Sequence, residues 1–181
     1  MRFRHLAFIA LLLVPLAADV RHCLCDFARP ETLAVRECGL CLVAEKQPLD
    51  PPFFTIHDAN PNKPDRWLAL PRFHGQNPQE LAGMTMEQRT AYWTVAIAKA
   101  RDLWGDGWGL AINNLARRSQ CHMHIHIGRL KDCTEDDRFV AVDGAADIPL
   151  PREGEGLWIH PAAGKLHAHW GDDAPELKLQ P

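Results

Sequence analysis

Residues 120 to 130 read QCHMHIHIGRL and place a histidine at every second position three times in succession. Side chains two residues apart on a β-strand point to the same face, about 6.6 Å from one another. We therefore predict a strand from Cys121 to Ile127. Its apolar face carries Cys121, Met123, Ile125 and Ile127, and its opposite face carries His122, His124 and His126. Three imidazoles cannot fill a dry core without unpaired nitrogens, so this row needs partners.

The histidine row has three interpretations. It is a solvent-facing strand that happens to be rich in histidine, or a metal site, since two histidines at i and i+2 on a strand can hold one ion with a third ligand from elsewhere. In the third interpretation, it catalyses covalent chemistry at phosphorus. A neutral imidazole, with an unperturbed pKa of about 6.5, is a good nucleophile near neutral pH.

The sequence around the row predicts one α+β domain over residues 19–181. The chain has 181 residues, of which 46% are hydrophobic and 24% charged, an ordinary globular composition. We expect an antiparallel sheet of about five strands, one long helix at 86–104 and short helices. The strand segments are 53–58, 66–71, 108–113, 121–127 and a hairpin within 156–170. A capping box of Thr85 and Gln88 begins the long helix, the N-terminal segment is expected to be irregular, and the tail at 172–181 is expected to be loosely held.

The first eighteen residues, MRFRHLAFIALLLVPLAA, are typical of a secretory signal peptide. Their apolar run is shorter than the roughly 20 residues that span a bilayer, although an uncleaved membrane anchor is the alternative. Without residues 1–18 the chain has 18 basic and 23 acidic residues, a net charge of −5. Nucleic-acid-binding surfaces need the opposite balance. We expect an exported protein, periplasmic or secreted, that does not bind nucleic acid.

The row and its flanks resemble the histidine triad (HIT) superfamily of nucleotide hydrolases and transferases. The resemblance rests on His122-Met123-His124-Ile125-His126-Ile127, on LAINNLARRSQ (110–120) before it and on FFTIHDANPNKPDRWLALPRFH (53–74), and it covers roughly residues 38–130. The block LAIN…RRSQCHMHIHI is especially similar to an exported branch, the bacterial CDP-diacylglycerol pyrophosphatases. The chain departs from many intracellular members at residues 115–118, where those members have a glycine-rich approach to the triad.

The resemblance implies a HIT-like fold and a role for each matching residue. His124 would be the nucleophile that attacks the α-phosphorus, His126 would line the phosphate site, and His122 would support the arrangement. Ser119 would approach the leaving group or a phosphate oxygen, and Asn113 would donate an amide hydrogen bond. Arg118 and its neighbour Arg117 offer guanidinium groups to a diphosphate, although adjacent arginines in a loop are more often solvated.

The implied activity is hydrolysis, or nucleotidyl transfer, at a phosphoanhydride in a nucleotide conjugate. The partner would be a small nucleotide conjugate or a nucleotide-linked lipid, with CDP-diacylglycerol as a candidate substrate. By analogy with many relatives, the protein could also form a homodimer. The competing function is an exported metal-binding protein that uses His122, His124 and His126 without catalysis.

The six cysteines leave a choice between zinc and disulfides. An exported chain normally forms disulfides, but Cys38-Gly-Leu-Cys41 has zinc-ligand spacing. In zinc-containing relatives, a histidine after the hairpin and the first triad histidine complete the set, which here implies a structural zinc on Cys38, Cys41, His74 and His122. A disulfide at Cys38 and Cys41 is the alternative.

If zinc occupies those cysteines, then Cys23, Cys25, Cys121 and Cys133 have three possible pairings. A bridge from Cys121 to Cys23 or Cys25 would fasten the N-terminal segment under the sheet. The C-terminal histidines His160, His167 and His169 read as surface residues, because nothing in the sequence identifies a further partner for them.

Overall fold

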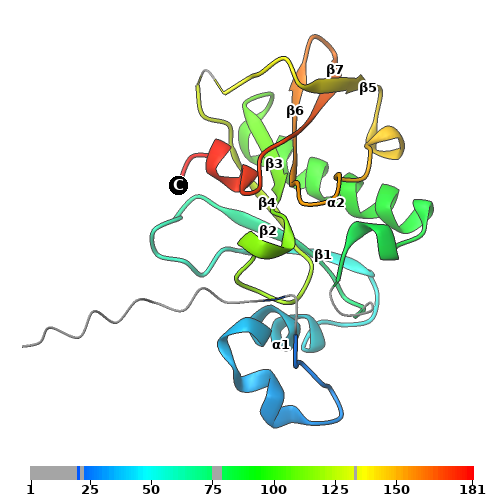
Figure 1. The fold of residues 1–181 in the computed structure, drawn as a ribbon, viewed down its shortest axis with the longest axis vertical. Helices are drawn as coiled ribbons and strands as arrows, with labels where there is room; N and C mark the ends of the chain where they lie inside the picture. The colour runs from blue at the N-terminus through cyan, green and yellow to red at the C-terminus, as the bar shows by residue number, and fades with distance from the viewer. Residues whose placement is uncertain (1–19, 21–22, 75–78, 133) are drawn as a thin grey trace, which may run out of the picture.

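The structure, a computed structural model, is an α+β fold built on one antiparallel sheet with strand order β1-β2-β4-β3-β6-β7-β5 (Figure 1). It describes residues 20, 23–74, 79–132 and 134–181, so the predicted signal peptide lies outside the described residues. The strands are β1 (Phe53–His57), β2 (Trp67–Pro71), β3 (Trp108–Ile112), β4 (Ile125–Arg129), β5 (Phe139–Val142), β6 (Leu157–Ala162) and β7 (Lys165–Trp170). The α-helices are α1 (Gly39–Glu45) and α2 (Met86–Trp104). The 3-10 helices are η2 (Pro30–Ala34), η3 (Arg36–Cys38), η4 (Leu81–Gly83), η5 (Leu115–Arg117), η6 (Ala145–Asp147) and η7 (Pro175–Lys178).

The predicted count of about five strands is wrong, because the described residues form seven. The additional strand β5 has only four residues, follows a charged loop and pairs with β7 alone, so the sequence carries little signal for it. The two predicted hairpins are confirmed as β1–β2 and β6–β7.

Helix α2 covers one face of the sheet and begins at the predicted capping box. The Gln88 amide donates to the Thr85 hydroxyl at 3.2 Å, and the Thr85 amide donates to the Gln88 side chain at 2.9 Å. Apolar residues recur at helical spacing and bury Tyr92, Trp93, Ala96, Ile97 and Ala100 against the strands. The Tyr92 hydroxyl donates to the Ala69 carbonyl at 2.7 Å and fastens the helix to β2.

The opposite face of the sheet, which we call the histidine face, carries the imidazoles. Residues that pair directly across strands share a face. One such row runs through Leu68, His126, Ala111, Trp158 and His169. It therefore crosses from the first hairpin, through the triad, to the C-terminal hairpin.

The predicted strand from Cys121 to Ile127 is wrong in its first half, since β4 begins at Ile125. The Cys121 amide donates to the Glu37 carbonyl at 2.7 Å, and the Met123 amide donates to the Gln79 side chain at 2.9 Å. These backbone groups thus take partners outside the sheet. His122 and His124 lie in the loop that leads into β4, and only His126 is on the strand.

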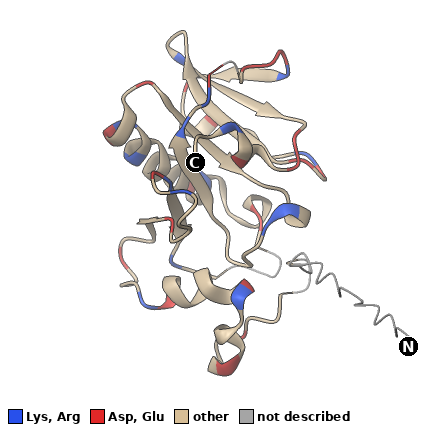
Figure 2. Ribbon diagram, turned by 90° about the vertical axis from the view of Figure 1, so that its left-hand side faces the viewer, with Lys and Arg blue, Asp and Glu red and all other residues tan. Residues whose placement is uncertain are grey.

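Two disulfides fasten the N-terminal segment to the rest of the chain. Cys23 bonds to Cys121, as one of the predicted pairings had it, and Cys25 bonds to Cys38. Both bonds fit an oxidising compartment. None of the helices in the described part of the chain has the length and apolarity needed to cross a bilayer. Figure 2 shows Lys and Arg interspersed with Asp and Glu along the ribbon.

The C-terminal tail is docked on the histidine face, so the prediction of a loosely held tail is wrong (Figure 1). Gly109 and Gly128 pair directly and leave a depression there, because a Cβ on Gly109 would lie 2.5 Å from Leu179. Leu179 is buried in this depression. The Arg66 guanidinium donates to the carbonyls of Glu176 and Leu179 at 2.9 and 2.7 Å. These contacts hold η7 over the sheet.

Replacing Gly128 with alanine is expected to displace the tail. The new Cβ would lie 2.8 Å from the Cδ of Arg66 and 3.2 Å from the Cβ of Leu179. Overpacking of this kind costs about 1 to 3 kcal/mol, which urea unfolding would measure. Gly144→Ala is the matched control, since its Cβ meets nothing within 4 Å. Equal stability of the two variants would contradict the proposed role of the depression.

Candidate active site

A cleft of about 420 Å³ opens on the histidine face beside the triad. Its walls come from α1, the β1–β2 loop, the β3–β4 loop and η7. Of the predicted residues, His124, His126, Asn113, Arg118 and Ser119 line it. His122 is not among the lining residues, because its ring is directed toward His74 and Cys41.

The ring of His124 is held in one tautomer. Its Nδ1 lies 2.8 Å from the carbonyl oxygen of His122. A carbonyl can only accept, so Nδ1 carries the proton and Nε2 keeps the lone pair in the neutral ring. Burial, with the nearby charge of Arg118, lowers the pKa of His124 to about 4. At neutral pH, His124 therefore offers an unprotonated nitrogen in the cleft.

His126 lies beside a carboxylate that the sequence pattern does not predict. Glu176 of η7 places Oε2 3.6 Å from the Nδ1 of His126. Its Oε1 accepts from the Asn113 amide at 2.9 Å, and its backbone amide donates to Asn113 at 3.1 Å. The Lys63 ammonium pairs with the same carboxylate. Asn113 is therefore bound to Glu176, and both nitrogens of His126 are buried without a hydrogen-bond partner.

The pKa of Glu176 is lowered to about 2. Burial alone would raise it, but interaction with His126 and hydrogen bonds from Lys63 and Asn113 outweigh that effect. The ionised carboxylate therefore stabilises the fold above its unfolded pKa, and this contribution is lost as the pH falls from about 4.5 to about 2. For His126, in contrast, burial disfavours the protonated ring and so lowers the pKa well below its ordinary value.

Glu176→Gln is expected to reduce the free energy of unfolding at neutral pH, by at most about 3 kcal/mol. The difference between wild type and variant should shrink below about pH 4.5 and vanish near pH 2, because the wild-type carboxylate is then protonated. Urea unfolding at a series of pH values measures this. A difference that does not change with pH would show that Glu176 acts through packing rather than charge.

The predicted site residues Arg118 and Ser119 also line the cleft, but Arg118 is buried whereas Ser119 is exposed. Arg118 is buried and donates to the carbonyls of Asn113 at 3.0 Å and Gln79 at 2.6 Å. Its guanidinium thus fixes the β3–β4 loop as well as lining the cleft, whereas the adjacent Arg117 is exposed and pairs with Asp173. Ser119 is exposed at the rim of the cleft.

The predicted zinc ligands are only partly brought together. Cys41, His74 and His122 place their ligand atoms within 4.8 Å of one another. Cys38 does not join them, because it is bonded to Cys25, and the alternative disulfide between Cys38 and Cys41 is also wrong. The predicted four-ligand set is thereby corrected to three residues that could hold a metal ion.

The chemistry of this group fits a metal. His122 donates from Nε2 to the Pro71 carbonyl at 2.8 Å, which leaves its buried Nδ1 without a partner. Both ring nitrogens of His74 lack hydrogen bonds, although its Nε2 lies 3.4 Å from a Glu45 oxygen. Burial raises the pKa of the Cys41 thiol to about 11 and lowers that of His122 to about 3. Unpaired buried nitrogens beside a thiol are suited to a soft cation.

In comparisons with known proteins, no family model matches the chain and no curated protein is significantly similar to it.

Proposed function

We propose that this protein is a histidine-triad-type hydrolase or nucleotidyl transferase that cleaves a phosphoanhydride in a nucleotide conjugate. The observation that carries the proposal is the geometry of His124. Its Nδ1 is committed to the His122 carbonyl, and the ring lines a cleft large enough for a small ligand. The lone pair on Nε2 is the nucleophile, which is fixed in position before substrate arrives.

The reaction proceeds in two steps. Nε2 of His124 forms a bond to the α-phosphorus while the bridging P–O bond breaks, and the leaving phosphate takes the electron pair. Water then attacks the same phosphorus, releases the nucleoside monophosphate and restores the imidazole. Another acceptor in place of water would make the protein a transferase. Basic side chains that line the cleft, such as Arg36, stabilise the charge that develops on the phosphoryl oxygens.

The cleft walls favour a substrate that combines phosphate with apolar groups. The apolar wall residues are Leu40, Val43, Ile56 and Leu68, and Arg36 and Arg118 are basic. Lys63 and Arg117 also line the cleft, but they are paired with Glu176 and Asp173. Apolar walls with a few placed polar groups are typical of small-molecule sites. CDP-diacylglycerol remains our candidate substrate, and we propose that the chain acts outside the cytoplasm, where its disulfides persist.

Zinc on Cys41, His74 and His122 is part of the proposal, with Glu45 as the nearest candidate for a fourth ligand. Cys41 and Glu45 are four residues apart on α1 and share a helix face. When bound, zinc would cross-link α1 to the loop after β2 and to the start of the triad. Its role here is structural, since His122 lies outside the cleft lining.

A metal carrier that uses the whole histidine row has weaker support. Within the described part of the chain, the groups placed to share an ion include His122 but neither His124 nor His126. In the histidine row, His122 therefore belongs to the candidate metal group, whereas His124 and His126 line the cleft.

Turnover of CDP-diacylglycerol in detergent micelles, alongside soluble nucleoside diphosphate conjugates, tests the proposal. We expect CMP and phosphatidate to appear in equal amounts, or the corresponding monophosphate from a soluble conjugate. Consumption of none of these substrates by folded protein would contradict it.

A further inference from the structure

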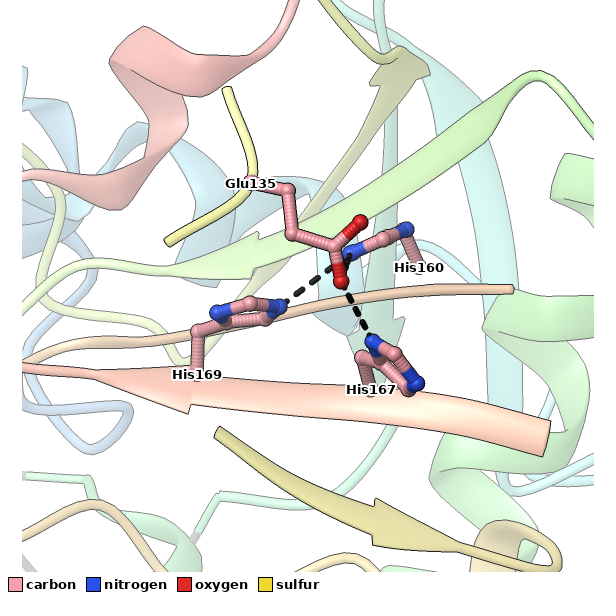
Figure 3. A group of neighbouring side chains, drawn as sticks. All are labelled: Glu135, His160, His167 and His169. Atoms are coloured by element: carbon pink, nitrogen blue, oxygen red, sulfur yellow. Dashed lines mark hydrogen bonds and ion pairs between the residues drawn. The ribbon is translucent and has the colours of Figure 1, made fainter. Parts of the chain in front are cut away.

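A second group of histidines lies at the far end of the cross-strand row. His160 on β6 pairs directly with His167 on β7, and His169 follows two residues later on the same face. Glu135, from the loop before β5, supplies a fourth side chain (Figure 3). The prediction that these histidines are simple surface residues is wrong for His160 and His169, which are buried.

The hydrogen bonds of His160 and His169 leave two lone pairs facing each other. Nδ1 of His160 lies 3.2 Å from the Pro161 carbonyl, and Nδ1 of His169 lies 3.4 Å from an Asp136 carboxylate oxygen. Both acceptors require a proton on Nδ1, so each neutral ring keeps its lone pair on Nε2. The two Nε2 atoms are 3.1 Å apart. Two acceptors at this distance repel one another unless a cation lies between them.

The other two side chains converge on the same point. Nδ1 of His167 is 2.5 Å from Oε1 of Glu135, and this oxygen is 3.8 Å from Nε2 of His160. The four ligand atoms all lie within 4.8 Å of one another. A single proton shared by His160 and His169 would satisfy those two rings, but it would not account for the approach of His167 and Glu135.

The spacing suits a tetrahedral ion. Two nitrogens that each bind zinc at about 2.0 to 2.1 Å with tetrahedral angles are about 3.3 Å apart, close to the 3.1 Å between His160 and His169. Three imidazoles and one carboxylate are a ligand set that zinc and other divalent first-row metals accept.

Neighbouring residues orient the rings of His160 and His169 in the way that is usual for metal-binding histidines. Such histidines donate their second N–H to a carboxylate or a carbonyl, as His169 does to Asp136 and His160 does to Pro161. Trp158 stacks on His169 with ring centroids 3.8 Å apart and planes 13° apart. The ring of His169 is therefore oriented before any ion binds.

We propose that Glu135, His160, His167 and His169 form a binding site for one divalent transition-metal ion, with zinc the ion that fits best. This site is separate from the Cys41 group and from the cleft. His169 and His126 are three strand positions apart on the row, a distance of about 14 Å at about 4.8 Å per strand. The proposal therefore does not depend on the triad chemistry.

The test is a count of bound zinc in tag-free protein that has been stripped with a chelator and dialysed against zinc. His167→Gln and Glu135→Gln are the variants of choice, because these side chains are partly exposed and the substitutions leave the core intact. His57→Gln, at an exposed histidine on β1, is the matched control. Thermal unfolding with chelator present should be the same for all proteins, which would confirm folding.

We expect His167→Gln to bind one zinc fewer per chain than wild type and His57→Gln, whatever the Cys41 group binds. Glu135→Gln should weaken the same ion at least about tenfold. With cobalt, the spectrum lost in His167→Gln should lack a thiolate charge-transfer band, because none of the four proposed ligands is a thiol. Unchanged zinc stoichiometry and affinity in both variants, or no zinc binding by wild type, would overturn the proposal.

Discussion

Wild-type protein exposed briefly to a nucleoside diphosphate conjugate is expected to gain one nucleotidyl group on His124, which adds the mass of a nucleoside monophosphate less one water. The expectation follows from the fixed tautomer of His124, a residue that lines the cleft. Its Nδ1 is bound to the His122 carbonyl, so the lone pair is on Nε2. Intact mass spectrometry after an alkaline denaturing quench, which preserves a phosphorus–nitrogen bond, would detect the adduct. Comparison among conjugates would also identify the nucleotide.

His124→Ala should form no adduct and should lose turnover by about 10⁴-fold or more, because removal of a nucleophile disables the whole two-step pathway. His57→Ala is the matched control, since His57 is exposed and does not line the cleft. An adduct that persists in His124→Ala would place the nucleophile elsewhere. Turnover without any adduct, unaffected by His124→Ala, would favour direct attack by water.

Removal of the Cys23–Cys121 disulfide is expected to cause a large decrease in the free energy of unfolding. The bond joins residues 98 apart, and a loop of this length contributes about 4 to 5 kcal/mol in the chain-entropy description. The double variant Cys23→Ser/Cys121→Ser avoids leaving a free thiol. Denaturant unfolding should show a loss of this order, together with reduced activity, because Cys121 directly precedes His122.

The Cys25–Cys38 disulfide is an internal comparison for this prediction. Its residues are only 13 apart, so its removal through Cys25→Ser/Cys38→Ser should cost about 3 kcal/mol. The variant that lacks the Cys23–Cys121 disulfide, which closes the longer loop, should therefore be the less stable of the two. The reverse order would mean that native contacts of the N-terminal segment, rather than loop length, determine the effect.

Local signals explain what the sequence predicts correctly. The Thr85 capping box and the apolar spacing that follows it lie within one helix, so α2 is predicted from its own residues. The hairpins β1–β2 and β6–β7 are likewise defined by short apolar runs around turns. The cleft residues His124, His126, Asn113, Arg118 and Ser119 come from the triad and one adjoining loop, so their proximity is also a local matter.

The features that were missed depend on strand register and on distant segments. Glu176 reaches His126 from η7, which Arg66 and the docking of Leu179 beside Gly109 and Gly128 hold over the sheet. Neither glycine signals this docking in the sequence. Glu135 reaches the C-terminal histidines through the pairing of β5 with β7. The H-x-H pattern at 167–169 was the visible part of that group.

The two faces of the sheet allow stability and chemistry to be engineered separately. Helix α2 and the apolar side chains that face it form the main core, whereas the cleft and both candidate metal groups involve the histidine face or the segments packed on it. Substitutions that stabilise helix α2, for example on its solvent-exposed side, can raise the melting temperature of the protein without altering any side chain of the cleft. The protein is therefore a suitable scaffold for engineering. Metal-ligating side chains on the histidine face can be exchanged in a variant whose helix α2 has been stabilised.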